Sequence, residues 1–293
     1  MCGIFGFTNL NQKNRNLAWL LAYSMENRGA DSWGASDGNE VIKYSGPISA
    51  NFHLPKHWKQ AIVHTRSASI GLQDGKAFAE NAHPFIFDGR VKKVIGVHNG
   101  YVANWQQLNQ QYQPFPVDSM HIFHHMAEGL PLAELEGRGT IAWFEPRDGR
   151  MQIHLARWNY GDLEVALEDN DGGLVFCSTE EPILRGARLC RIKIAKGYQK
   201  PADGYTHIFD GQELIKLEKF GFKEMVYQTT IPHRPTLDGL NGFTPCRKCS
   251  TRHTMHVICL PCMKELRAKF EAEWPQMKRE EKGVLNWGGF IKV

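Results

Sequence analysis

The sequence predicts an α+β protein that carries a small cysteine-rich module near its C-terminal end. Short apolar runs bounded by turn residues recur through residues 1–228, a pattern typical of the strands of a sheet. Leu17, Leu20, Leu21 and Met25 recur near helical spacing and predict a helix early in the chain. Together these patterns favour one large mixed domain.

The first predicted strand is Cys2–Thr8, an apolar segment interrupted by glycines. The helix after it is expected to stop at Gly29. Asp148-Gly149 is a strong hairpin signal between two later apolar runs. Those later runs, each interpreted as a strand, are Ala61–Val63, Val94–Val97, Thr140–Phe144, Ile153–Ala156 and Leu174–Cys177.

Three regions follow from these patterns. Residues 1–228 form the α+β domain, and residues 229–245, with three prolines, are interpreted as a linker. Residues 246–293 hold the cysteine module, followed by an apolar helical stripe that Pro275 is expected to end. The stripe consists of Met263, Leu266, Phe270 and Trp274.

Composition narrows the class of protein. The chain has 293 residues, and its 42% hydrophobic content is enough to fill a core. No apolar run is long enough to span a membrane, and the N-terminus lacks a basic stretch leading into an apolar signal segment. We therefore expect a cytoplasmic protein without a membrane segment. Residues 246–293 contain ten Lys and Arg against five Asp and Glu, so the positive charge belongs to the tail.

The most informative position is Cys2, directly after Met1. Removal of Met1 would leave a thiol and a free α-amine on one residue. An α-amine titrates at about pH 8 and can serve as a general base, while a thiol is a strong nucleophile. Cys2 would then combine a nucleophile with its own base. The alternative, an ordinary buried cysteine after the start codon, remains open on this position alone.

Further polar segments occur in a fixed order after Cys2. They are Arg28-Gly29-Ala30-Asp31, Gly34, His64-Thr65-Arg66, Asn81-Ala82-His83-Pro84, His98-Asn99-Gly100 and Asp118-Ser119. In this order the chain resembles the class II glutamine amidotransferases over residues 2–220. The resemblance implies the four-layer αββα sandwich of the N-terminal nucleophile hydrolases.

The resemblance also implies roles for these residues. Arg66 would bind the α-carboxylate of free L-glutamine, since a guanidinium meets a carboxylate with two parallel hydrogen bonds. Asp118 would accept the substrate ammonium group. Cys2 would attack the side-chain amide, and Asn99 and Gly100 would donate hydrogen bonds to the oxyanion.

Read singly, these residues have plainer interpretations. Arg66 alone would be a surface or core-rim arginine, Asn99-Gly100 a turn, and Asp118 a helix N-cap. The chain also departs from the family pattern after the arginine. Ser69 keeps a hydroxyl near the substrate, but Ile70 stands where many members have a histidine. These departures affect the loop over glutamine and leave the nucleophile and the oxyanion donors in place.

The tail contains a separate site. Two Cys-x2-Cys pairs separated by nine residues suit tetrahedral coordination of zinc by thiolates, with iron or a redox dithiol pair as alternatives. The predicted ligands are Cys246, Cys249, Cys259 and Cys262. Four protein ligands leave no open position, so the zinc would be structural, and catalysis would need no cofactor. The basic residues around it permit docking on a protein or contact with nucleic acid.

No acceptor domain is recognisable in the remaining residues. The resemblance therefore implies a subunit that hydrolyses glutamine to glutamate and ammonia, with a separate synthetase or transferase consuming the ammonia in trans. Two other functions stay open at this point. One is an N-terminal-nucleophile amidase acting on another amide without an acceptor. The other is an inactive zinc-dependent protein that binds nucleic acid or acts as a scaffold.

Overall fold

The structure is a computed structural model of the chain, which divides into two compact units, Met1–Met225 and Val226–Val293. It describes residues 2–68, 79–147, 149–159, 161–168, 173–211, 213–223, 243–245 and 252–254. Within the described part of the chain, no helix is both long and apolar enough to cross a membrane.

The described residues of the second unit form two short strands. β14 (Phe243–Pro245) and β15 (Arg252–Thr254) pair in an antiparallel arrangement. The rest of the predicted linker 229–245 and of the module 246–293, including all four candidate zinc ligands, lies outside the described residues. The linker, the module and its zinc therefore stay predictions.

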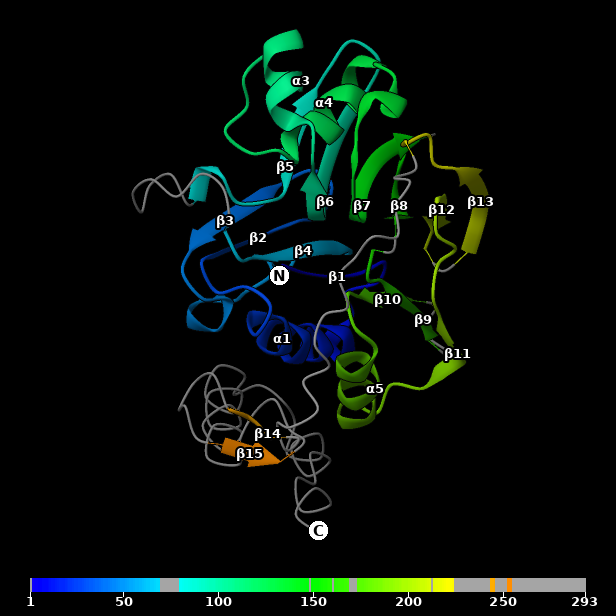
Figure 1. Ribbon diagram of the computed structural model, residues 1–293. Coiled ribbons are helices and arrows are strands. Elements are labelled where there is room, and N and C mark those ends of the chain that lie inside the picture. The colour runs from blue at the N-terminus through cyan, green and yellow to red at the C-terminus, as the bar shows by residue number, and fades with distance from the viewer. Residues whose placement is uncertain are drawn as a thin grey trace. The chain divides into compact units, whose positions relative to one another are not determined.

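Two sheets form the centre of the first unit (Figure 1). Sheet A has the strand order β11-β9-β10-β1-β4-β2-β3, and sheet B has the order β13-β12-β8-β7-β6-β5. Every described strand pair within them is antiparallel. Sheet A consists of β1 (Gly3–Phe7), β2 (Ser32–Ser36), β3 (Val41–Ser45), β4 (Ala61–Arg66), β9 (Glu164–Glu168), β10 (Leu174–Cys177) and β11 (Ile194–Gln199). Sheet B consists of β5 (Phe85–Asp88), β6 (Lys93–Val102), β7 (Gly137–Arg147), β8 (Arg150–Trp158), β12 (Tyr205–Asp210) and β13 (Glu213–Lys219).

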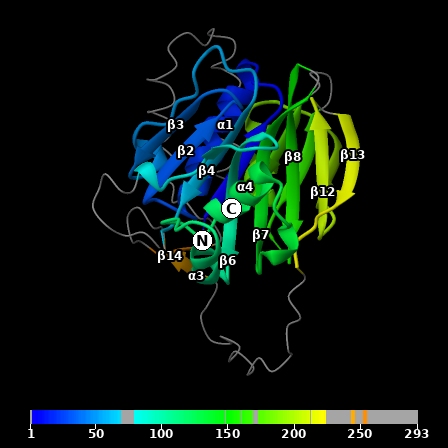
Figure 2. The same ribbon diagram turned by 90° about the horizontal axis from the view of Figure 1, so that it is seen from above.

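Helices cover the outer faces of both sheets. α1 (Gln12–Glu26) and α5 (Glu180–Leu189) contact each other and pack on sheet A, while α4 (Met120–Glu128) packs on β5 and β6 of sheet B (Figure 1). α3 (Trp105–Gln111) lies between β6 and α4 in the chain, and short 3-10 turns occur at Ile48–Ala50 and Leu132–Glu134. The layer order is helix, sheet, sheet, helix (Figure 1), and Figure 2 gives the view from above, with β2, β3 and β4 on the left and β12 and β13 on the right.

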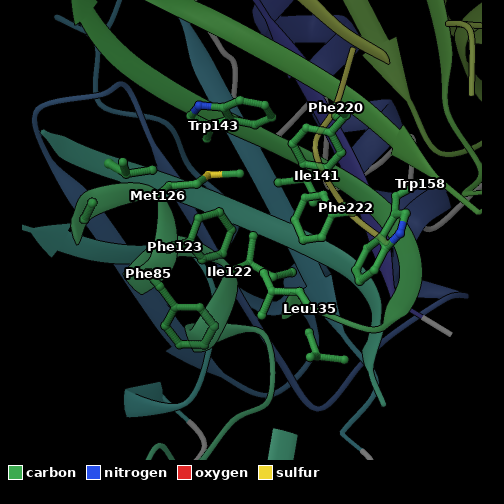
Figure 3. Close-up of a cluster of buried hydrophobic side chains, with 14 of the residues drawn as sticks. Phe85, Ile122, Phe123, Met126, Leu135, Ile141, Trp143, Trp158, Phe220 and Phe222 are labelled. Carbon is green, nitrogen blue, oxygen red and sulfur yellow. The ribbon is translucent and has the colours of Figure 1, made fainter. Parts of the chain in front are cut away.

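Two apolar clusters hold these layers together. Between the sheets, Ile4, Ile62 and Phe176 of sheet A meet Val97 and Phe144 of sheet B. A second cluster joins α4 to sheet B (Figure 3). It includes Phe85, Ile122, Phe123, Met126, Ile141, Trp143 and Trp158. Full burial of each such side chain stabilises the fold by about 1.5–3 kcal/mol.

The predicted α+β class is confirmed, with two antiparallel sheets. The predicted strand Leu174–Cys177 matches β10, and Arg147 of β7 pairs with Arg150 of β8 at the predicted hairpin, of which Asp148 lies outside the described residues. Gly149 has φ 76°, which favours glycine.

Strands β4 and β6 extend beyond their predicted ends at Val63 and Val97. His64–Arg66 and His98–Gly100 were expected after their strands, but they lie inside β4 and β6. The Asn99-Gly100 dipeptide is therefore extended backbone opposite β7, and its interpretation as a turn is wrong. The polar residues that continue these buried strands end the apolar runs, so the sequence pattern predicted shorter strands.

Candidate active site

Cys2 and Arg66 become neighbours through the pairing of β1 with β4. Gly3 lies opposite Thr65 in that ladder, so the same register continued by one residue sets Cys2 opposite Arg66. Side chains two residues apart on a strand share a face. Cys2 therefore shares the face of Ile4, which packs between the two sheets.

The opposite sheet contributes Asn99 by the same alternation. Val97 of β6 and Ile62 of β4 both belong to the apolar cluster between the sheets. Asn99 lies two residues beyond Val97, and Arg66 lies four residues beyond Ile62, so both continue the inner faces of their strands. β4 and β6 contact each other. The structure thus brings Cys2, Arg66 and Asn99 to one end of the space between the sheets.

The Cys2 thiol sits against the backbone of Ser67. The Ser67 N–H donates to Cys2 Sγ at 3.4 Å, and Sγ lies 3.7 Å from the Ser67 carbonyl oxygen. Burial raises the pKa of the thiol, while the Ser67 hydrogen bond and the positive charge of Arg66 lower it. Because the net direction is upward, the thiol needs a nearby base to become a thiolate.

Asp118 occupies a position that the sequence analysis placed at a helix start. It is only 7% exposed, and its Oδ2 accepts a hydrogen bond from the Val102 N–H of β6 at 2.7 Å. The N-cap of α4 is Ser119, so the interpretation of Asp118 as a helix cap is wrong. Burial lowers the pKa of Arg66, whereas the thiolate of Cys2 and the carboxylate of Asp118 raise it. The cation and the anion are therefore close enough to interact.

The segment around Gly29 fixes the end of β4. The helix before it ends at Glu26, and Gly29 has no positive φ, so its expected role as a helix stop is wrong. A Cβ on Gly29 would lie 2.4 Å from the carbonyl carbon of Arg66. Asp31 donates its N–H to the Arg66 carbonyl at 3.0 Å and accepts from the Ala68 N–H at 2.7 Å. Gly29 and Asp31 thus hold the backbone that carries the arginine.

Arg28 has a role that sequence reasoning missed. Its Nε donates to the main-chain carbonyl of Cys2 at 2.8 Å, and its Nη2 lies 3.4 Å from Asp162 Oδ2. Arg28 therefore orients the residue that bears the thiol. The only sequence signal was the position of Arg28 in the ordered segments, because the partner at the start of the chain is 26 residues away.

Two buried histidines lie behind the site. The rings of His64 and His83 are 4.1 Å apart, and His64 Nε2 lies 3.1 Å from the His98 carbonyl oxygen. Burial lowers the pKa of His64 to about 3 and that of His83 well below its usual range. Both His83 ring nitrogens are buried without a hydrogen-bond partner among the described residues. Both rings are therefore neutral in the fold at neutral pH.

These histidines predict a loss of stability in acid. Their pKa values are lower in the folded than in the unfolded chain, so the unfolded state binds more protons below about pH 6.5. The free energy of unfolding should fall by about 1.4 kcal/mol per pH unit for each ring as the pH drops below 6.5. Urea unfolding at several pH values measures this slope. His83→Phe should reduce the slope of unfolding free energy against pH by the contribution of one proton. Replacement of the exposed His57 by alanine should leave the slope unchanged. Equal slopes in the parent and both variants would contradict the assignment of a neutral His83 to the folded state.

Other predicted residues are not brought to this site by the described structure. Ser69 lies outside the described residues, as do Cys246, Cys249, Cys259 and Cys262. The described residues contain no group of three or more His, Cys, Asp or Glu side chains that could hold a metal ion. The roles of the zinc ligands and of Ser69 stay predictions.

Known proteins resemble this chain in sequence and in fold. No protein-family model matches it. It is 35% identical over 201 residues to a glutamine–fructose-6-phosphate aminotransferase [isomerizing] of Methanosarcina mazei, covering 64% of this chain and 31% of that protein. The corresponding protein of Methanosarcina acetivorans is 34% identical over 190 residues, covering 62% of this chain and 28% of the relative. The chain thus spans about a third of the length of these curated relatives.

Two solved structures share the fold. Glutamine phosphoribosylpyrophosphate amidotransferase from B. subtilis superposes with a TM-score of 0.53 at 20% identity, covering 75% of this chain and 49% of that chain. A structure described as the allosteric regulatory enzyme of purine biosynthesis gives a TM-score of 0.55 with the same identity and coverage. With helices on the outer faces of two facing antiparallel sheets, the chain has the αββα layers that the resemblance implied.

The sequence similarity agrees with the resemblance to the class II glutamine amidotransferases that the ordered motifs carry.

Proposed function

We propose that this chain hydrolyses L-glutamine to glutamate and ammonia, with Cys2 as the nucleophile. The observation that carries the proposal is the convergence of Cys2 and Arg66 at one end of sheet A with Asn99 of β6 and with Asp118 from the turn before α4. This set supplies a thiol, a cation, an amide donor and an anion. Free glutamine presents the matching groups, namely an amide, a carboxylate and an ammonium.

Substrate binding uses the two buried charges. Arg66, which is 4% exposed, pairs with the α-carboxylate, and Asp118 accepts the α-ammonium group. Lysine or glutamine at position 66 would bind the α-carboxylate less well, because only a guanidinium presents two parallel donors. Removal of water from both charges strengthens the two contacts. The side-chain amide of glutamine is then directed towards the thiol.

The first chemical step forms a thioester. With Met1 removed, the α-amine of Cys2 takes the thiol proton as Sγ attacks the amide carbon. The carbonyl oxygen becomes an oxyanion, which the Asn99 side chain and the Gly100 N–H stabilise. Collapse of the tetrahedral intermediate breaks the C–N bond. The α-ammonium group of Cys2 returns its proton to the leaving nitrogen, and ammonia departs.

The second step regenerates the enzyme. Water, deprotonated by the same α-amine, attacks the thioester carbon and passes through a second oxyanion. The C–S bond breaks, the thiolate recovers its proton, and glutamate is released. The reaction thus consumes one water and gives one glutamate and one ammonia. It needs no cofactor.

A direct test combines turnover with mass spectrometry. Amide hydrolysis should occur with glutamine and not with asparagine or N-acylated amino acids, because their lengths or charges do not match Arg66 and Asp118. The glutamine-like electrophile diazo-oxo-norleucine should give one adduct on an N-terminal cysteine from which Met1 is absent. Preferential hydrolysis of another amide would instead support the amidase function, and an intact Met1 with no adduct would refute the mechanism.

Arg28 offers a prediction about the orientation of Cys2. Arg28→Gln removes the donor to the Cys2 carbonyl, so kcat should fall about tenfold or more while KM changes little, because small misplacement of a reacting group is costly. Asp162→Asn is the matched control, since Asp162 is 52% exposed and such ion pairs contribute little. Steady-state kinetics separate the two parameters. An unchanged kcat in Arg28→Gln would show that this bond does not orient the nucleophile.

We also propose that ammonia is used by a separate synthetase or transferase. The chain spans about a third of the length of its curated relatives. Pull-down with the chain, followed by glutamine-dependent amination in the presence of the captured protein, tests this. Glutaminase activity that no captured protein alters would argue for an independent amidase.

The four C-terminal cysteines are proposed to bind one structural zinc ion. Two Cys-x2-Cys pairs supply the thiolate set that zinc prefers. The antiparallel strands β14 and β15 flank the first pair in the chain, since β14 ends at Pro245 and β15 begins at Arg252. Elemental analysis should find about one zinc per chain, and Cys246→Ser with Cys249→Ser should abolish it. Iron in place of zinc, or no metal, would refute the assignment.

A further inference from the structure

A chain of hydrogen bonds connects β6 to the Asp118 carboxylate. His98 Nδ1 lies 2.9 Å from Ser119 Oγ, and Ser119 Oγ donates to Asp118 Oδ1 at 3.4 Å. His98 and Ser119 are buried, at 1% and 3% exposure. His98 directly precedes Asn99 in the strand. His98 therefore contacts Ser119, whereas Asn99 faces the space between the sheets.

The positions of the hydrogen atoms follow from what each group can donate. A carboxylate only accepts, so the single Ser119 hydrogen must point at Asp118 for that bond to exist. His98 Nδ1 must then carry a hydrogen and donate to Ser119 Oγ. If the neutral ring instead carried its hydrogen on Nε2, which lies 3.3 Å from the Arg138 carbonyl, Nδ1 would take the Ser119 hydrogen. Asp118 would then lose a donor.

The ring is held tightly in this place. A Cβ on Gly100 or on Gly139 would lie 2.5 Å or 2.4 Å from His98 Nε2, so the ring fills the space that two paired glycines leave open. His64 Nε2 contacts the carbonyl of His98 at 3.1 Å and fixes its backbone as well. The imidazole therefore cannot shift away from Ser119 without moving β6 or β7.

The strand alternation separates His98 from the reacting atoms. Val94 and Val102 share its face of β6 and pack in the cluster against α4, whereas Asn99 faces sheet A. His98 therefore does not point at the Cys2 thiol. A role as general base does not fit this placement, and a role through Ser119 does.

We propose that His98 is a positioning residue which, through Ser119, holds the Asp118 carboxylate in the orientation that binds the substrate ammonium. This inference rests on the proposed function, since it concerns the substrate amine. It assigns the Nδ1–H of the ring a specific task and leaves Nε2 without one in substrate binding. A purely structural role would not distinguish between the two ring nitrogens.

Two substitutions separate the two nitrogens. Asn places an amide nitrogen where His98 has Nδ1, and Gln places it where the ring has Nε2. In a Cys2→Ala background, which binds glutamine without turning it over, calorimetry gives the Kd for L-glutamine. We expect His98→Asn to stay within about threefold of the parent and His98→Gln to weaken binding about tenfold. Ser119→Ala should weaken binding to the same extent, and combining it with His98→Gln should add little.

A control reaction keeps the result interpretable. In the chain that retains Cys2, alkylation of the thiol by iodoacetamide should proceed at the same rate in both His98 variants, since this reagent needs no Asp118. Equal Kd values for the Asn and Gln variants, whether both normal or both weakened, would overturn the inference while leaving the proposed function standing. Absence of glutamine binding in Cys2→Ala itself would overturn both.

Discussion

Cys2→Ala is expected to lower glutamate release by about 10⁴-fold or more, the largest effect of any single substitution in this chain. The reason is that no other described group stands where Cys2 does, opposite Arg66 and against Ser67. Cys2→Ser should be almost as damaging, because a hydroxyl of similar size is a much weaker nucleophile at neutral pH. A coupled glutamate assay with purified variants measures both.

A matched control shows that the effect belongs to this thiol. Cys190→Ser should retain full activity, because burial raises the pKa of the Cys190 thiol to about 12 and it lies at the end of α5. Cys177 is similarly inert, with a pKa raised to about 11 by burial. Substantial glutamate release by Cys2→Ala would contradict the thioester mechanism.

The α-amine can be tested apart from the thiol. A lysine inserted between Met1 and Cys2 would block removal of the initiator methionine and leave the thiol attached to an ordinary peptide bond. Because the mechanism assigns proton transfer to the free amine, this variant should be as inactive as Cys2→Ala. Normal activity would show that the base is another group.

The order of the motifs was enough to predict the class of fold, while the roles of the site residues stay predictions. The resemblance assigns specific tasks to glycine, arginine and asparagine at these positions, which restricts their residue types even where the local structure is not obvious. His64-Thr65-Arg66 shows the limit of this reasoning. The sequence predicts a role for Arg66, but it ends the strand at Val63, whereas Arg66 is the last residue of a fully buried strand.

Contacts between distant segments explain what the sequence could not predict. The bond from Arg28 to Cys2 depends on where α1 ends relative to β1, and the Asp118 bond to Val102 depends on where α4 begins over β6. Local patterns contain neither distance. Asp118 before an apolar helical segment looks like a cap, and only the tertiary packing shows that its carboxylate is used elsewhere.

Gly29 illustrates the same point for the backbone. A glycine near the end of a predicted helix is commonly its stop, because a left-handed residue ends many helices. Here the absence of a side chain serves a close approach instead, since a Cβ would lie 2.6 Å from the Ser67 nitrogen. Local sequence cannot distinguish these two uses, because both demand glycine for steric reasons.

Asn99→Asp is expected to lower kcat about 10²–10³-fold, the size typical for loss of one preorganised oxyanion donor. Aspartate has the shape of asparagine, but it offers no N–H and adds a negative charge where the oxyanion forms. Gly100 is a poorer target, because a Cβ there would lie 2.0 Å from the Arg138 carbonyl oxygen and would distort β6 and β7. Asn99 is therefore the residue that isolates the oxyanion interaction.

Three measurements decide whether Asn99 acts on the transition state. The Kd for glutamine in a Cys2→Ala background should change only a few-fold on Asn99→Asp, because Arg66 and Asp118 bind the groups at the other end of the substrate. The rate of Cys2 alkylation by iodoacetamide should also persist, since that reaction forms no oxyanion. A fall in kcat with both of these retained places the loss in the tetrahedral intermediate, whereas an unchanged kcat would mean that the oxyanion is stabilised by donors other than Asn99.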